Sequence, residues 1–186
     1  MKAKTTSSTI YYKLNGGSMR KLKADEIECR IGTIAKGEGG PKGISLLLYK
    51  DARCDMAILD EEVGPMNWQR HHSRDNANCI VSIRDATGEW VEKEDVGTAS
   101  NTEAEKGIAS DSFKRACTNW GIGRELYTAP FIWVPAEKLT IKMTGVGKYT
   151  TTDKFTVKLI DYDKAGNICQ LVIENQKHQE VFSWRA

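Results

Sequence analysis

Apolar residues recur every three or four positions between residues 101 and 120, and this spacing predicts one amphipathic helix. The apolar stripe consists of Ala104, Ile108, Ala109, Phe113, Ala116, Cys117 and Trp120. Ser100 followed by Glu103 fits a capping box, in which each side chain bonds the other residue's backbone amide. Gly121 can adopt the left-handed conformation that ends a helix. We therefore expect a helix over residues 101–120.

The chain before this helix shows strand-like and helix-like patterns in turn. The run ISLLLY (44–49) is continuously apolar and predicts a buried strand. A helix is expected from Asp51 until Gly64 and Pro65 end it. Three strands complete the pattern, over residues 67–73, 79–83 and 89–96. This order predicts an α+β fold in which an antiparallel β-meander packs against a long helix.

The flanking segments carry weaker patterns. Residues 25–31 are a candidate short helix, and residues 37–43 are a glycine-rich loop. Phe131 to Trp133, between two prolines, can form a short strand only at a sheet edge. Three later strands predict a small β-meander, over residues 155–159, 168–173 and 181–184. We therefore divide the chain into a mobile basic arm (1–20), a main domain (21–135), a linker (136–152) and a C-terminal β-meander extension (153–186).

Composition indicates an ordinary soluble globular protein. The 186 residues carry a net charge of only +2, so any nucleic-acid surface must be local. The five cysteines form no CxxC pair, which is typical of reduced core cysteines in an intracellular protein. The sequence shows no membrane-spanning run and no signal peptide at its beginning. We expect a cytoplasmic location and no membrane contact.

The polar face of the predicted helix carries the candidate chemistry. Lys106, Ser110 and Lys114 lie four residues apart and align along the helix, and Arg115 lies beside Lys114. Asp111 is spaced to pair with either of the last two cations. The pattern fits a solvated helix face with internal ion pairs. It also fits a row of cations for a phosphate backbone.

Two strings of residues resemble a known family. The first is Asp95-Val96-Gly97 followed by the helical core from Asp111 to Ala116 (DSFKRA), and the second is LDEEVGPMNWQR, from Leu59 to Arg70. Their order and spacing resemble the Rad-fifty-two/Rad-twenty-two family of single-strand DNA annealing proteins. The resemblance covers about residues 45–135. The chain's size is similar to that of the small phage-type recombination proteins in this family.

The resemblance implies a function and a set of DNA-binding residues. Such proteins bind single-stranded DNA and anneal complementary strands without ATP, in homologous recombination and double-strand break repair. They are not enzymes, use no cofactor or metal, and form rings or helical oligomers. A single-strand-binding protein or an exonuclease is a candidate protein partner, and a phage-encoded member would act in the host cytoplasm. The DNA-binding residues expected here are Lys114, Arg115, Lys106, Arg70, Arg74, Lys93 and Arg124.

Lys114 and Arg115 match the Lys-Arg pair with which the family contacts DNA. Lys106 and Arg70 match further basic positions. Thr118 stands where eukaryotic members carry another arginine, so we expect either a weakened inner groove or a contact moved to Lys93 or Arg124. One of the two histidines at positions 71 and 72, near Arg70 and Arg74, would add positive charge below neutral pH.

Other functions need different patterns. The Walker sequence GxxxxGK[ST] is absent, and we expect no ATP hydrolysis. His71 and His72 are adjacent on a strand and face opposite ways, so they cannot hold one metal together. A metal-dependent nuclease is the alternative function, with Asp60, Glu61, Glu92, Glu94 and Asp95 as candidate ligands. An oligomeric structural protein without a DNA role is a further alternative.

Overall fold

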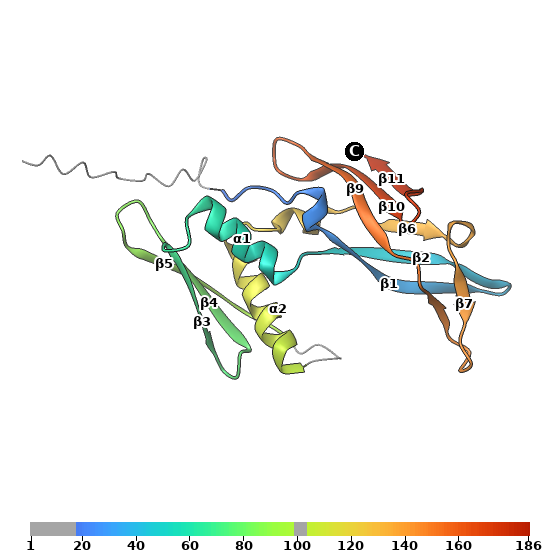
Figure 1. Cartoon of the computed structure of the whole chain (residues 1–186), viewed down its shortest axis with the longest axis horizontal. Helices are drawn as coiled ribbons and strands as arrows, with labels where there is room; N and C mark the ends of the chain where they lie inside the picture. The colour runs from blue at the N-terminus through green and yellow to red at the C-terminus, as the bar shows by residue number, and fades with distance from the viewer. Residues whose placement is uncertain (1–17, 99–103) are drawn as a thin grey trace, which may run out of the picture. The chain divides into compact units, whose positions relative to one another are not determined.

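The computed structural model describes residues 18–98 and 104–186, with the side chains of the second helix described from Gly107 onward (Figure 1). Residues 1–17 of the expected basic arm and the expected capping box of Ser100 and Glu103 lie outside the described residues. The fold is α+β with antiparallel sheets, as predicted. The chain forms two compact units, one from residues 1–20 and 55–121 and the other from residues 21–54 and 122–186.

Unit 1, from residues 1–20 and 55–121, contains a three-stranded antiparallel sheet and two helices. Its elements in order are α1 (Ala52–Glu62, whose first turn belongs to the other unit), β3 (Trp68–Ser73), β4 (Asn78–Arg84), β5 (Trp90–Val96) and α2 (Ala104–Asn119). The sheet order is β3-β4-β5, and α2 packs on one face of it (Figure 1). The three strands and two helices lie in the stretches where the sequence predicts them, and α2 is described over 16 residues where a helix of residues 101–120 is expected.

The core of unit 1 lies between the sheet and α2. Alternate residues of β4 (Cys79, Val81 and Ile83) are at most 2 % exposed and face α2. The predicted apolar stripe supplies the other side, because Phe113, Ala116 and Cys117 are fully buried. Residue 19, which was assigned to a mobile arm, is a buried methionine, and Arg20 forms an ion pair with Glu61. The end of the predicted arm is therefore part of unit 1.

Unit 2, from residues 21–54 and 122–186, is built on one six-stranded antiparallel sheet with the order β11-β10-β9-β1-β2-β6. Its strands are β1 (Glu28–Gly37), β2 (Gly40–Tyr49), β6 (Ile132–Pro135), β9 (Phe155–Tyr162), β10 (Ile168–Asn175) and β11 (Glu180–Arg185). A separate hairpin pairs β7 (Ile141–Met143) with β8 (Tyr149–Thr151). Three short 3₁₀ helices also belong to it, namely η2 (Ala24–Glu26), η3 (Arg124–Thr128) and η4 (Ala136–Lys138).

A buried carboxylate fixes the start of unit 2. Glu125 is 1 % exposed, and its Oε1 accepts a hydrogen bond from the Leu22 backbone amide at 2.7 Å. Its Oε2 lies 3.6 Å from the Lys21 ammonium. The Tyr162 hydroxyl donates to the Leu22 carbonyl at 2.8 Å. These contacts join residues that are far apart in the sequence, so they could not be predicted from local patterns.

Several predictions for unit 2 differ from the structure. Residues 25–31, expected as a short helix, form η2 and the start of β1, because β1 pairs with the apolar strand β2. Most of the expected loop 37–43 is strand, with a tight turn at Gly40 (φ 129°). Residues 136–152, assigned to a linker, contain η4 and the β7–β8 hairpin. The predicted edge strand is present as β6, which pairs only with β2.

The C-terminal strands form the predicted meander, since β9 pairs with β10 and β10 with β11. They do not stand alone. Thr156 of β9 also pairs with Glu28 of β1, so the meander continues the sheet that the N-terminal strands begin. Unit 2 is thus assembled from segments on both sides of unit 1 in the sequence.

None of the five cysteines, all of which lie in the described part of the chain, forms a disulfide. Cys79 and Cys117 are buried as predicted, whereas Cys54 is half-buried. Burial raises the pKa of the Cys79 thiol to about 11 and that of Cys29 to about 12, so both thiols are protonated near neutral pH. No helix in the described part of the chain has the length and apolar character needed to cross a membrane.

Candidate nucleic-acid interface

Gly97, at the end of β5, allows this strand to approach the backbone of α2. A Cβ atom at this position would lie 2.7 Å from the Ile108 carbonyl oxygen and 2.9 Å from Ser112 Cα, and it would also collide with the Ser112 amide nitrogen. Such distances are shorter than van der Waals contact, and backbone atoms cannot rotate away as a side chain does. The glycine of the DVG string is therefore required for the packing of helix against strand.

The two residues before Phe113 fasten α2 to its surroundings. Ser112 is fully buried, and its hydroxyl donates to the Asn76 carbonyl, in the turn between β3 and β4, at 2.9 Å. Asp111 Oδ2 accepts a hydrogen bond from the Thr98 backbone amide at 2.9 Å. Together with Gly97, these contacts fix the position of the helix on the sheet.

Phe113 connects the buried side of α2 with β3. Its ring stacks on Trp68 with centroids 6.1 Å apart, and the Trp68 indole donates to Asp60 at 2.7 Å. The Arg70 guanidinium lies 4.6 Å from the centre of the Phe113 ring. This is a cation–π arrangement. Arg70 is itself exposed. The ring of Phe113, the residue before Lys114, therefore contacts a cation that faces the solvent.

Arg115 is oriented by β5. Its Nε lies 3.3 Å from Asp95 Oδ1, and the Arg115 side chain is 48 % exposed. The ion pair is thus made with the strand, rather than with Asp111 on the same helix. Because Phe113 contacts β3 and Arg115 contacts β5, Lys114 lies between them on the helix, about 100° from each. Lys114 is half-buried. Lys114, Arg115 and Arg70 therefore all lie on the side of the sheet that α2 covers.

Lys93 has a different environment. Its ammonium donates to the carbonyl of Asn119, the last residue of α2, at 2.8 Å and lies 4.5 Å from the centre of the Trp120 ring. A cation at this position satisfies a free helix carbonyl and interacts favourably with the helix dipole. The Trp120 indole donates to the Val81 carbonyl at 3.0 Å, in agreement with the expected core placement of this tryptophan. The charge of Lys93 thus already has partners within unit 1.

Comparison with protein-family models identifies this arrangement. Residues 55–142 match the model described as Rad52/22 family double-strand break repair protein. Residues 55–142 are therefore similar to a Rad52/22 family domain. The matched region contains all of β3, β4, β5 and α2 and continues into unit 2. No curated protein and no solved structure matches the chain.

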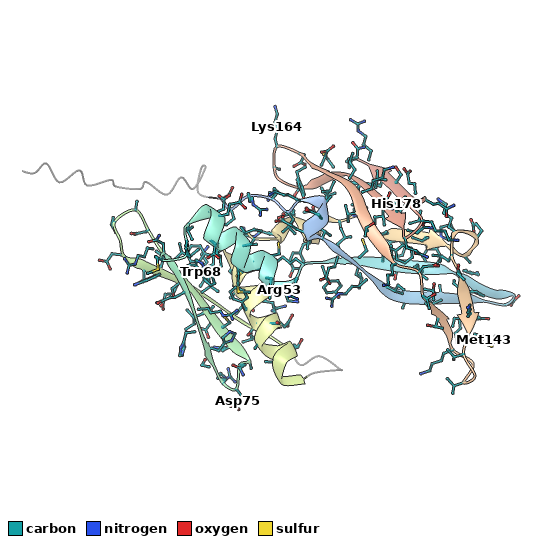
Figure 2. All side chains as sticks on the ribbon, viewed as in Figure 1. Arg53, Trp68, Asp75, Met143, Lys164 and His178 are labelled. Carbon is teal, nitrogen blue, oxygen red and sulfur yellow. The ribbon has the colours of Figure 1, made fainter. Side chains whose placement is uncertain are left out.

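The remaining expected DNA-binding residues lie in three places. Arg74 is exposed at the turn between β3 and β4, with a left-handed backbone (φ 51°), next to Asp75 at the tip of that hairpin (Figure 2). Lys106 belongs to the first turn of α2, and its side chain lies outside the described part. Arg124 is exposed in η3 and belongs to unit 2.

The opposite face of the β3–β4–β5 sheet carries acidic side chains. Glu92 and Glu94 are exposed there, where Glu92 accepts from Ser82 at 3.1 Å and Glu94 accepts from the side-chain amide of Asn78. Asp95 points to the α2 side. The carboxylates proposed for the nuclease alternative are thus split between the two faces of the sheet and α1. Among the described residues, no group of three or more His, Cys, Asp or Glu side chains could hold a metal ion.

The two histidines of β3 face opposite sides of the sheet, as expected. His72 lies on the α2 side, with Nδ1 3.4 Å from the Ser112 hydroxyl. Burial lowers the pKa of His72, and the charges of Arg70 and His71 lower it further. His72 is therefore neutral at physiological pH.

Sequence reasoning proposed candidate cations for the site but not the residues that contact them. Gly97, Asp95, Ser112 and Phe113 position the helix or its cations, and all four occur inside the first of the two strings that carry the family resemblance. Their roles depend on contacts between separate segments, which are 20 residues apart for Asp95 with Arg115 and 36 residues apart for Asn76 with Ser112. Periodicity along one helix or strand does not contain that information.

Proposed function

We propose that the chain binds single-stranded DNA through its phosphates and anneals complementary strands without nucleotide hydrolysis. The match of residues 55–142 to a family of double-strand break repair proteins supports a role in recombination. The observation that carries the finer proposal is the placement of Lys114 and Arg115. Both belong to a helix that Gly97, Asp111 and Ser112 fix on the sheet.

The chemistry of annealing explains why cations on a rigid helix suit this task. Contacts to phosphates carry no sequence information, so they leave the bases free to test pairing. Base pairing itself releases free energy, and no nucleotide fuel is needed. A chain of net charge +2 contributes only a few contacts. We propose that several copies assemble into a ring or a filament, so that repetition supplies the affinity.

The proposal is tested by the annealing of two complementary fluorescent oligonucleotides without ATP. The wild type is expected to accelerate annealing, with a rate that falls as salt rises from about 50 mM to about 200 mM. The variant Lys114→Ala/Arg115→Ala should lose the acceleration. For single strands, a plot of the logarithm of the DNA-binding constant against the logarithm of the salt concentration has a negative slope. Each lost phosphate contact should make this slope shallower by about 0.7.

A matched control removes the same charge elsewhere. Lys158→Ala/Lys164→Ala changes two exposed lysines of unit 2, and Lys164 lies at the tip of the β9–β10 turn (Figure 2). This control should anneal DNA like the wild type. If the wild type does not accelerate annealing at any salt concentration, the proposal is wrong, and cleavage of single strands in the presence of Mg²⁺ becomes the next assay.

A further inference from the structure

The contact between Arg115 and Asp95 uses only one edge of the guanidinium. Asp95 Oδ1 accepts from Nε at 3.3 Å, and this is the ion pair that Arg115 forms among the described residues. A guanidinium carries five N–H donors in a rigid plane, of which Nε supplies one. The four N–H groups of the two terminal nitrogens therefore remain for another acceptor. The side chain is 48 % exposed, so a ligand can reach it.

Asp95 is itself held in place. Its Oδ1 also accepts from the Val96 backbone amide at 2.7 Å, and its Oδ2 accepts from the Asn119 side-chain amide at 3.4 Å. The same Asn119 amide donates to the Glu94 carbonyl at 2.9 Å. The carboxylate is thus attached both to β5 and to the end of α2. Its side chain is 24 % exposed, half the exposure of Arg115.

We propose that Asp95 is a positioning residue for phosphate recognition. By binding Nε, it directs the two terminal nitrogens of Arg115 outward, where they can bind two oxygens of one DNA phosphate. Paired N–H···O bonds of this kind are charge-assisted and depend strongly on orientation. The inference rests on the proposed function and adds to it the reason for an acidic residue beside a DNA-binding cation.

This role has an unusual consequence for the sign of a mutational effect. A carboxylate next to Arg115 repels a phosphate, so simple electrostatics predicts that its removal strengthens DNA binding. Positioning predicts the reverse, because without Asp95 the long Arg115 side chain must be ordered at the moment of binding. The two explanations therefore differ in the direction of the change, and not merely in its size.

The experiment measures binding of the full chain to a fluorescent oligothymidylate by anisotropy. Asp95→Ala is expected to weaken binding by about threefold to tenfold, the effect of breaking one shared hydrogen-bond network. Asp95→Asn should give an intermediate affinity, because its amide oxygen still accepts from Nε. The control Glu92→Ala removes the same charge from the other face of β5, so it should leave the affinity unchanged or slightly higher.

A second background separates positioning from a general loss of structure. In Arg115→Lys the side chain has no Nε, so the further change Asp95→Ala should no longer weaken binding. A loss of the same size in both backgrounds, or tighter binding by Asp95→Ala alone, overturns the inference while the proposed function stands. If the wild type does not bind the oligonucleotide, both fail. Should Asp95→Ala not fold, Asp95→Asn in the two backgrounds decides the question in the same way.

Discussion

The substitution Gly97→Ala provides the sharpest test of how the site is built. In most strands, alanine in place of glycine stabilises a protein by about 0.5–1 kcal/mol, because glycine loses more conformational entropy on folding. Gly97 has no positive φ that would penalise a side chain. Backbone preference alone therefore predicts a gain in stability.

The contacts with α2 predict a loss instead. The new methyl group would lie 2.7 Å from the Ile108 carbonyl oxygen and 2.9 Å from Ser112 Cα, where ordinary contacts begin at 3.4 Å. Relief requires a shift of helix from strand by about 0.5–1 Å, and a gap of that size removes a quarter to a half of the dispersion energy across it. Overpacking of this kind costs about 1–3 kcal/mol. Because several backbone atoms are involved at once, we expect a net destabilisation of about 2 kcal/mol after the entropic gain.

Urea unfolding followed by circular dichroism measures the total effect, and hydrogen exchange locates it. Exchange should accelerate in peptides from β5 and α2, whereas peptides from β9 to β11 serve as an internal reference. Gly145→Ala is the matched control, because a Cβ atom there meets nothing within 4 Å and the backbone has no positive φ. If Gly97→Ala unfolds at the same or a higher urea concentration than the wild type, the close approach of β5 to α2 does not have the importance argued here.

Two further predictions concern the contacts beneath the helix. Ser112→Ala removes the buried donor to the Asn76 carbonyl, so it should cost about 1–3 kcal/mol in urea unfolding, while the exposed neighbour change Ser110→Ala should be nearly neutral. The lowered pKa of His72 means that the native state binds its proton less readily than the unfolded chain, whose value is near 6.5. The stability that His72 contributes is therefore complete above about pH 6.5 and declines as the pH falls through that value. His72→Gln should reduce the difference between urea midpoints measured at about pH 8 and about pH 5.5, and an unchanged difference would assign the acid sensitivity to other groups.

Much of unit 1 was predictable because its patterns are local. The alternation of Cys79, Val81 and Ile83, the apolar stripe of α2 and the stop at Gly64 each lie within one element. Such patterns identify the buried face of an element without knowledge of its partner. The candidate cations Lys114 and Arg115 were likewise proposed from a local pattern, since they are adjacent in the sequence.

Unit 2 was less predictable because its sheet is closed by distant segments. Residues 25–31 carry no clear strand pattern. They contain the end of η2 and the start of β1, which forms a hairpin with β2 and also pairs through Glu28 with the distant Thr156 of β9. The same limitation applied to the site. The sequence places Asp111 at a helical distance from Arg115, but Asp95, 20 residues away, is the actual partner. Helical spacing identifies which groups are able to meet, and the tertiary structure selects among them.

The distribution of charge in unit 1 gives its two faces different relations to DNA. Between residues 55 and 121, acidic residues outnumber basic ones, so this region as a whole does not attract a polyanion. Glu92 and Glu94 are exposed on the sheet face away from α2, whereas Arg70 and Arg115 are exposed on the face that α2 covers. We therefore expect a DNA strand to meet the face that α2 covers rather than the face that carries Glu92 and Glu94. Because a phosphate backbone has no sequence signal that could orient it, this asymmetry is what would confine a bound strand to the surface along α2.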